Sequence, residues 1–433
     1  MLANGTTIKG TAGGVFTIIS ELGAGGQGAV YKARDAAGRD VAVKWYFNLP
    51  NRPDRRHIED LARRGAPSKQ FLWPQEVVQS GADFGYVMGL RPQGFADVPS
   101  LLKRKVKPKL STLARAAIEI ASAFRKLQEK GLFYCDISEG NLFFSVETGE
   151  VLICDNDNVS SSGQLPGVLG TARYMAPEIV RGEANPSANT DIHAMAVLLF
   201  LLLFNDHPLQ GANEAKIRAF DAAAMDYLYG KNPVFIFDPN DTQNRPVPGV
   251  GDNAVAYWDL YPHAARPMFI KTFTDGIKDP ARRPAFQEWM RGLTSIEDGV
   301  LECSCGKQNF FEPSEPDRRC WGPSCKRPLG SPMRILIGKN RTVVLNTDTK
   351  IFPHHLNPLL DAGVRGAHIA EITPHPTNGT FGLRNTSTQH WYVTDYPANG
   401  SDPTVHTVET GRAIGLRDRL EIDFGGTRGV VSC

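Results

Sequence analysis

The chain has 433 residues, and 41% of them are hydrophobic, which is enough for two or three domains with buried cores. Its formal net charge of +2 argues against a dedicated nucleic-acid-binding protein. The sequence shows neither a cationic start with an apolar leader nor an apolar run long enough to span a membrane, so we expect a cytoplasmic protein without membrane contact.

A glycine-rich turn between two predicted strands is the first motif in chain order. Residues 16–19 and 31–33 have the composition of strands, and glycines between them let backbone amides approach phosphate oxygens. Val30 follows the last glycine by two residues and, with the flanking strands, favours a phosphate-binding hairpin over the strand-to-helix turn of dinucleotide-binding proteins. The turn consists of Gly23, Ala24, Gly25, Gly26, Gln27 and Gly28.

Lys44 ends the apolar run that begins at Val41 and is predicted to lie on a buried strand. Such a lysine needs an anionic partner, which in phosphoryl transfer is the α- and β-phosphates together with a glutamate from a helix. The polar stretch 52–64 predicts that helix, with Ile58 and Leu61 on one face and Glu59 as the expected partner of Lys44. The alternatives are a solvated Glu59 and an exposed edge-strand position for Lys44.

A carboxylate and a carboxamide five residues apart form the most informative motif, Asp136-Ile-Ser-Glu-Gly-Asn141. An aspartate that accepts a hydroxyl proton and an asparagine that holds a metal ion are what phosphoryl transfer requires from one short loop. The apolar strand 151–154 ends at Asp155, which is therefore the predicted second metal ligand. Asp157 is a further candidate, and the choice of main ligand between the two aspartates stays open.

Three later segments complete the pattern. Gly170-Thr-Ala-Arg-Tyr-Met-Ala-Pro-Glu178 closes a loop of the length of an activation segment. Residues 191–204 are apolar on all sides but too few to cross a bilayer, which predicts a buried helix. Asp279-Pro-Ala-Arg-Arg-Pro284 follows at the far end of this region.

In this order the motifs resemble the eukaryotic-type (Hanks-type) serine/threonine protein kinases, also found in bacteria, over about residues 15–296. The resemblance implies an α+β, bilobal protein kinase domain over residues 1–296, with a β-rich N-lobe (about 15–91), a helical C-lobe (about 92–296), and ATP and Mg²⁺ between them. It implies that Asp136 is the catalytic base, that Asn141 and Asp155 hold Mg²⁺, and that Glu178 and Arg283 form a buried ion pair. The ATP-binding residues would be the glycine-rich turn, Val30, Ala42, Lys44, Glu59, Met88 at the gatekeeper position and Leu90 in the hinge.

Departures from the family pattern are equally informative. Tyr134-Cys135-Asp136 replaces His-Arg-Asp, so no arginine stands ready to bind an activation-loop phosphate, and we expect activity that does not depend on that switch. Ser138 replaces the usual lysine, and Asp155-Asn-Asp157 replaces Asp-Phe-Gly. A pseudokinase, an ATP-binding scaffold that acts through C-terminal docking modules, is the alternative. Retention of Lys44 and of the three predicted catalytic-loop and metal residues favours an active enzyme.

Four of the seven cysteines form two pairs, Cys303 with Cys305 and Cys320 with Cys325. Two turn-borne thiolate pairs about fourteen residues apart are typical of tetrahedral Zn²⁺ in a zinc ribbon, here expected over residues 297–331. Two disulfides are the alternative. The ribbon is more simply a connector or docking module than a nucleic-acid-binding element.

Short alternating runs from residue 332 onward predict an all-β sandwich over residues 332–433. Gly338-Lys339, Asn378-Gly-Thr380 and residues 415–425 resemble, in order, the forkhead-associated domain, a family that binds phosphothreonine peptides. Because Lys339 stands where that family has arginine, and its Ser-x-x-His is missing, partner docking is the expected role rather than phosphopeptide binding.

The sequence thus predicts a protein kinase domain, a zinc ribbon and a forkhead-associated-like sandwich. The expected activity is transfer of the γ-phosphate of ATP to serine or threonine hydroxyls of protein substrates, including autophosphorylation. The layout resembles kinases encoded beside a von Willebrand A-type protein and a PP2C-type phosphatase, which are therefore the expected partners.

Overall fold

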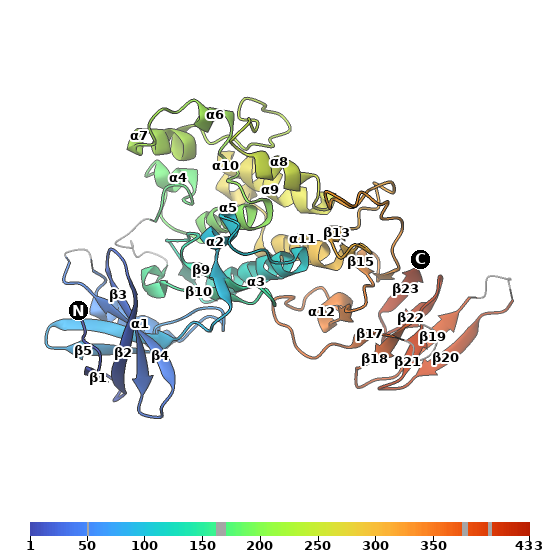
Figure 1. The fold of residues 1–433 in the computed structure, drawn as a ribbon, viewed down its shortest axis with the longest axis horizontal. Coiled ribbons are helices and arrows are strands. Elements are labelled where there is room, and N and C mark those ends of the chain that lie inside the picture. The colour runs from blue at the N-terminus through green and yellow to red at the C-terminus, as the bar shows by residue number, and fades with distance from the viewer. Residues whose placement is uncertain (50–51, 162–169, 375–379, 397–400) are drawn as a thin grey trace. The chain divides into compact units, whose positions relative to one another are not determined.

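The computed structural model describes residues 1–49, 52–161, 170–374, 380–396 and 401–433 (Figure 1). The chain forms two compact units. Unit 1 comprises residues 1–107, 123–251 and 272–283, and unit 2 comprises residues 108–122, 252–271 and 284–433. None of the helices in the described part of the chain is long and apolar enough to cross a membrane.

The N-terminal part of unit 1 is a closed antiparallel barrel of six strands in the order β1-β2-β3-β4-β6-β5. Alternate side chains point into it, as the two-residue period of a strand requires, and Ile18, Tyr31, Val43 and Val87 belong to its core. The predicted glycine-rich hairpin is β2 and β3, and Lys44 lies on β4. The strands are β1 (Thr7–Gly10), β2 (Val15–Ala24), β3 (Gly28–Asp35), β4 (Asp40–Tyr46), β5 (Glu76–Ser80) and β6 (Asp83–Gly89).

The helix predicted at residues 52–64 is α1 (Arg55–Arg64). It begins where the Asp54 carboxylate accepts a hydrogen bond from the Arg56 amide, and it ends at Gly65, whose φ of 70° lies in the region that glycine tolerates best. Ile58 and Leu61 are buried, as their spacing predicted.

The remainder of unit 1 is mainly helical around α5 (Ala188–Phe204), which confirms the buried helix expected from its all-round apolar sequence. Ser187 and Thr190 form a capping box at its start, and Asn205 ends it with a φ of 60°. Short antiparallel sheets, β10-β9-β7 and β11-β8, carry the loops of the site. The other elements are β7 (Phe95–Asp97), α2 (Val98–Leu102), β8 (Leu132–Phe133), β9 (Leu142–Ser145), β10 (Val151–Ile153), η1 (Asn156–Asn158), β11 (Ser160–Ser161), α4 (Pro177–Val180), α6 (Ala212–Ala215), α7 (Ala222–Met225), η2 (Asp226–Lys231), α10 (Asp275–Lys278) and η4 (Pro280–Arg282).

Two helices, α3 (Leu110–Glu129) and α9 (Arg266–Phe273), contribute residues to both units. Unit 2 also contains a small helical part and the hairpin that carries the first cysteine pair. These elements are α8 (Asp252–Trp258), η3 (His263–Ala265), α11 (Phe286–Asp298), β12 (Val300–Glu302) and β13 (Gln308–Phe310).

The rest of unit 2 contains the predicted all-β region, which has a six-stranded sheet in the order β15-β14-β23-β22-β19-β20 and a four-stranded sheet in the order β16-β17-β18-β21. Trp391, Leu383 and Ile422 lie in the core that strands of the two sheets share. Asn378 and Gly379 of the predicted motif lie outside the described residues. The elements are β14 (Arg334–Ile337), β15 (Arg341–Val344), β16 (Lys350–Ile351), α12 (Pro353–Leu356), β17 (Ala370–Pro374), β18 (Phe381–Asn385), β19 (Trp391–Asp395), β20 (Thr404–Val408), β21 (Ala413–Gly415), β22 (Glu421–Asp423) and β23 (Arg428–Ser432).

Within unit 2, the segment between β16 and β17 is fastened to α3 by buried polar contacts. The Arg115 guanidinium donates to the carbonyl oxygens of Ala362 and Gly363 at 2.7 and 2.9 Å. The Ser122 hydroxyl donates to Asp361 at 2.7 Å. A Cβ on Gly363 would lie 2.2 Å from that of Ser122, so a glycine is needed for this close approach.

Candidate active site

The hairpin of β9 and β10 brings two predicted metal ligands together. Leu142 of β9 and Ile153 of β10 are paired across it. Asn141 comes just before β9 and Asp155 just after β10, so both lie at the same end of the hairpin. The Cys154 amide donates to the Asn141 carbonyl oxygen at 2.9 Å, which closes the end of the ladder. Asp155 adopts a left-handed backbone with φ 61° and ψ 45°, a conformation that aspartate tolerates better than most residues, and this turns the chain at the cleft.

The catalytic loop is tied to both of these ligands. The Asn141 side-chain amide donates to the Asp136 carbonyl oxygen at 3.1 Å, which leaves the amide oxygen of Asn141 available for a metal ion. The Tyr134 hydroxyl, in the place of the family's histidine, donates to the backbone oxygens of Cys154 and Asp155. The loop and the metal-ligand turn therefore form one hydrogen-bonded group.

Burial raises the pKa of Asp136, and the charges of Asp155 and Asp157 raise it further, while Lys44 opposes them. A raised pKa suits a carboxylate that must take up a proton during the reaction. Burial likewise raises the pKa of Asp155, again with Asp157 adding and Lys44 opposing. The site therefore concentrates negative charge.

Lys44 is the positively charged residue among the carboxylates of Asp136, Asp155 and Asp157. Its ammonium group donates to Asp155 Oδ1 and, at 2.8 Å, to Asp157 Oδ2. Burial alone would lower the pKa of Lys44, but the charges of Asp157 and Asp155 raise it, so the side chain stays protonated. The prediction that Lys44 is buried and paired with an anion is confirmed, since its side chain is 7% exposed.

The predicted pairing of Lys44 with Glu59 is wrong for this structure. Glu59 instead accepts a hydrogen bond from Arg55 Nε at 2.8 Å, one turn earlier on the same helix, and its side chain is 40% exposed. The side chain of α1 that reaches the site is His57, whose Nε2 lies 3.1 Å from the Asp157 carbonyl oxygen. Residues 57 and 59 point about 200° apart on a helix, so His57 and Glu59 cannot both face the site.

The other predicted nucleotide-binding residues lie together. Val30 pairs with Lys44 across β3 and β4, and Ala42 pairs with Met88 across β4 and β6. Ala42 and Met88 belong to one hydrophobic cluster, and Val30 and Leu90 pack against it. An apolar wall next to a charged cluster suits the adenine and the phosphates of a nucleotide, respectively.

Glycines of the β2–β3 turn have two different roles. A Cβ on Gly28 would lie 2.3 Å from the Trp45 carbonyl oxygen, so packing against β4 requires glycine there. At Gly23, Gly25 and Gly26 a Cβ would meet no atom of the described residues within 4 Å. The turn that Ala24 and Gln27 share with these glycines therefore leaves its backbone open to a ligand.

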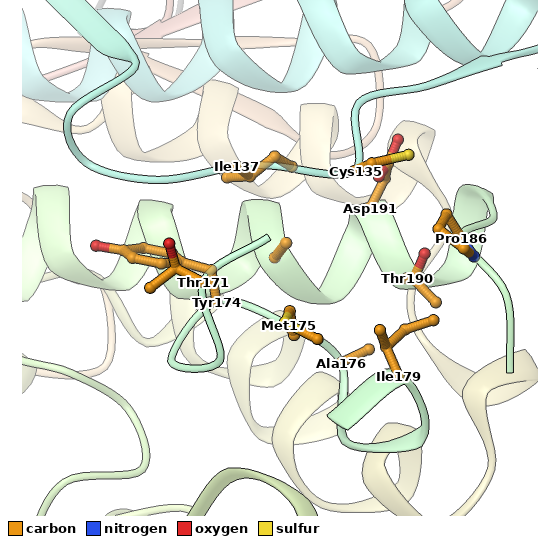
Figure 2. Close-up of a pocket in the computed structure, with 11 residues that line it drawn as sticks. Cys135, Ile137, Thr171, Tyr174, Met175, Ala176, Ile179, Pro186, Thr190 and Asp191 are labelled. Atoms are coloured by element: carbon orange, nitrogen blue, oxygen red, sulfur yellow. The ribbon is translucent and has the colours of Figure 1, made fainter. Parts of the chain in front are cut away.

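Cys135 occupies the position of the family's arginine and faces a small cavity. Its thiol lies 3.3 Å from the Ser160 hydroxyl, and burial raises its pKa to about 12, so the group is neutral. The cavity has a volume of about 20 Å³, room for a single water molecule. Figure 2 shows Cys135 and Asp191 on one side of it and Met175 and Ala176 across from them.

Asp191 of α5 fixes the backbone of this loop. Its carboxylate accepts a hydrogen bond from the Tyr134 amide at 3.0 Å, and burial raises its pKa to about 7. Cys135 itself has a φ of 62°, a conformation that such an anchor helps to hold.

The carboxylate and amide oxygens at this site fit Mg²⁺, which prefers oxygen ligands and keeps part of its water shell. Asp155 is 34% exposed, whereas the Asp157 side chain is fully buried. Asp155 and the amide oxygen of Asn141 are thus the protein atoms best able to hold the ion.

Unit 2 contains a second cluster suited to a metal. The sulfur atoms of Cys303, Cys305, Cys320 and Cys325 all lie within 4.8 Å of one another, and all four residues are free thiols. Two tight turns present them: the Cys303 amide donates to the Lys307 carbonyl at 2.9 Å, and the Cys320 amide to Arg327 at 2.8 Å. A hydrogen bond from the Cys305 backbone is the largest of the effects that lower the pKa of Cys303 to about 7, whereas, despite a hydrogen bond from the Lys307 backbone, burial and the neighbouring thiols raise the pKa of Cys305 to about 11.

Comparison with known proteins agrees with this geometry. The model of the protein kinase domain family matches residues 16–245, more than half of the chain. The chain belongs to the protein kinase family. It is 27% identical over 212 residues to a probable serine/threonine-protein kinase of Corynebacterium efficiens, covering 45% of this chain and 32% of that protein.

Two further relatives are similar over comparable lengths of the chain. The probable serine/threonine-protein kinase PknB of Corynebacterium glutamicum is 28% identical, covering 45% of this chain and 32% of the relative. The DNA damage-responsive serine/threonine-protein kinase RqkA of Deinococcus radiodurans is 28% identical, covering 50% of this chain and 33% of the relative. The chain thus spans about a third of the length of these relatives.

Proposed function

We propose that this member of the protein kinase family is an ATP-dependent serine/threonine kinase. The observation that carries the proposal is that Lys44, Asp136, Asn141 and Asp155 lie close together, in the arrangement that the kinase reaction requires. Kinase relatives with serine/threonine specificity support the choice of acceptor.

Asp136 would orient the acceptor hydroxyl and take its proton as the oxygen attacks the γ-phosphorus. The bond from phosphorus to the bridging oxygen breaks, and ADP leaves with that electron pair. Lys44 would bind the α- and β-phosphates, and the backbone of the β2–β3 turn would cover them. Mg²⁺, held by Asn141 and Asp155, would neutralise the phosphate charge.

The experiment compares wild type with Lys44→Ala in transfer from γ-labelled ATP to serine- and threonine-containing peptides, followed by phosphoamino-acid analysis. We expect labelled phosphoserine or phosphothreonine from wild type and a loss of about 10²- to 10³-fold in the variant. Lys32→Ala is the matched control, because Lys32 lies on the adjacent strand and pairs with Asp40 near the surface. ATP binding by wild type without transfer to any hydroxyl would instead identify a pseudokinase scaffold.

For the cysteine cluster we infer one Zn²⁺ per chain. Four thiols in two turns at this spacing match tetrahedral coordination, and the Cys303–Cys325 and Cys305–Cys320 sulfur distances of 3.8 and 3.6 Å suit ligands of one ion. A zinc ribbon over residues 297–331 would then connect a kinase domain of residues 1–296 to a forkhead-associated-like domain of residues 332–433. Free thiols agree with a reducing compartment such as the cytoplasm.

We further propose that the C-terminal region docks protein partners rather than reading phosphopeptides, since Lys339 replaces the arginine of forkhead-associated domains. A von Willebrand A-type protein and a PP2C-type phosphatase are the proposed partners, on sequence resemblance alone.

A further inference from the structure

The anion that holds Lys44 in place comes from an unexpected part of the chain. Asp157 lies two residues after the proposed metal ligand Asp155, and its side chain has no exposed surface. Its Oδ2 accepts hydrogen bonds from the Lys44 ammonium at 2.8 Å and from the Tyr46 hydroxyl. Both donors reach Oδ2, whereas Oδ1 is buried without a hydrogen-bond partner among the described residues.

The sequence around Lys44 provides for this contact. Lys44 and Tyr46 are two residues apart on β4, so both side chains lie on the same face of the strand. Burial, reinforced by the charge of Asp157, raises the pKa of Tyr46 well above its usual value. The phenol therefore remains a donor to the carboxylate.

The turn that presents Asp157 is fixed from both sides. The Asn156 side chain, in the position of the family's phenylalanine, donates to the carbonyl oxygens of Leu72 and Ile153 at 2.9 and 3.0 Å. From α1, the His57 ring contacts the Asp157 carbonyl oxygen at 3.1 Å. The carboxylate has little freedom to swing toward the cleft.

We propose that Asp157, rather than a glutamate of α1, is the positioning residue of Lys44, and that α1 acts on the site through His57 and the Asp157 backbone. This inference rests on the proposed kinase function. It separates the two aspartates by role: Asp155, partly exposed, serves the metal, and Asp157, fully buried, serves the lysine.

The donor count of Lys44 fits this arrangement. An ammonium group has three hydrogens, and Asp155 and Asp157 accept two of them. When Asp155 turns to the metal, Asp157 still holds Lys44 while two hydrogens face the phosphates. Because Asp157 belongs to the metal-ligand turn itself, Lys44 stays in place without the swing of a helix glutamate that controls many kinases.

The test measures ATP binding with and without Mg²⁺, and kcat and KM for ATP, in Asp157→Asn and in Glu59→Gln as matched control. We expect Asp157→Asn to weaken ATP binding in the absence of metal and to lower kcat/KM by about 10- to 100-fold, as for loss of a buried charge-assisted hydrogen bond. The Mg²⁺ concentration for half-maximal activity should not change. Glu59→Gln should leave all of these quantities within about twofold, as expected for an exposed pair.

Two further variants separate positioning from folding. Tyr46→Phe keeps the ring but removes one donor to Asp157, and we expect a smaller loss in the same direction. In a Lys44→Met background, Asp157→Asn should have no further effect on ATP binding, because its role is exercised through the lysine. Full additivity of the two substitutions in ATP binding would overturn the proposal.

Other outcomes contradict it in different ways. A rise in the Mg²⁺ requirement of Asp157→Asn would make Asp157 a metal ligand, and a matching loss in Glu59→Gln would restore the helix glutamate. If wild type transfers no phosphate, the proposed function fails, but the metal-free binding measurements still decide which anion positions Lys44.

Discussion

Two buried ion-paired sites in unit 1 differ in their charge balance. Arg283 donates to both carboxylate oxygens of Glu178 at 2.7 and 2.9 Å, and the two side chains are 0% and 8% exposed. One cation meets one anion in a bidentate pair. Lys44, by contrast, pairs with two aspartates, Asp155 and Asp157. Asp136 is the third carboxylate of this cluster, because the charges of the other two raise its pKa.

Burying a charge without a partner costs free energy. A balanced site and an unbalanced site are therefore expected to have different roles. The balanced pair needs no further charge, and it joins Glu178 of α4 to Arg283 at the end of η4. The unbalanced cluster carries a surplus of negative charge that a bound cation or a proton can neutralise. We therefore interpret the negatively charged cluster around Lys44 as the proposed reactive site. The balanced Glu178–Arg283 pair is interpreted as structural.

The largest effect on turnover is expected from a substitution in the unbalanced cluster. Asp155→Asn should reduce the turnover of the proposed kinase by about 10²- to 10³-fold, because the carboxylate proposed to bind Mg²⁺ is lost. Its thermal unfolding midpoint should stay the same or rise, since the substitution removes surplus charge. Steady-state phosphate transfer and calorimetry on the same sample check both statements. A strongly destabilised Asp155→Asn would show that the aspartate is structural.

The balanced pair should respond in the opposite way. Glu178→Gln leaves the Arg283 charge buried without its counter-ion, and we expect unfolding to become easier by about 3–5 kcal/mol. Denaturant unfolding measures the change. Glu183→Gln is the control, because Glu183 pairs with Arg181 at the surface, and its unfolding midpoint should be unchanged. Equal midpoints for the two variants would refute the structural role of the buried pair.

Metal removal extends the comparison to unit 2. Cys320→Ser should abolish the binding of the one proposed zinc ion, since Cys320 is fully buried in the cluster. Elemental analysis of protein purified without added metal gives the stoichiometry. Cys433→Ser should retain zinc, because Cys433 is exposed and lies outside the cluster. Zinc-free wild-type protein with four oxidised cysteines would indicate disulfides instead.

The smallest effect is a shift of the pH profile. Burial, with Asp155 and Asp157, raises the pKa of Asp136, and a base acts only when deprotonated. The value of kcat/KM should therefore be maximal above that raised pKa and fall as the pH decreases through it. The midpoint of this fall should lie at a higher pH than for an exposed aspartate. Asp395→Asn should leave the profile unchanged, because this half-buried carboxylate lies outside the site and hydrogen bonding to Arg417 lowers its pKa. An acid limb at or below the usual aspartate range would contradict the expected environment of Asp136.

Local motifs allowed much of the site to be predicted. Lys44, Asp136, Asn141 and Asp155 lie on short elements whose pairing follows from sequence order, so their convergence could be expected. The rotation of α1 about its axis could not, because Ile58 and Leu61 fix only a broad apolar face, and His57 lies closer to the site than Glu59. The role of Tyr46 had a signal, its two-residue spacing from Lys44 on a strand.

Parts of the fold had weaker signals. The strands β16 and β21 are short, and β18 and β23 contain glycine and charged residues that lower the strand propensity of their windows. The contact of Arg115 with Ala362 and Gly363 joins segments that are far apart in the sequence. No local sequence pattern predicts this contact. Long-range polar contacts of this kind require the structure.

The most direct test of the central claim is single-turnover phosphate transfer by Asp136→Asn at saturating ATP and Mg²⁺, with Asp83→Asn, an exposed change in the barrel, as control. If the negatively charged cluster is the catalytic site, Asp136→Asn should bind ATP like wild type and transfer phosphate about 10²- to 10⁴-fold more slowly. Transfer at the wild-type rate by Asp136→Asn would contradict the account.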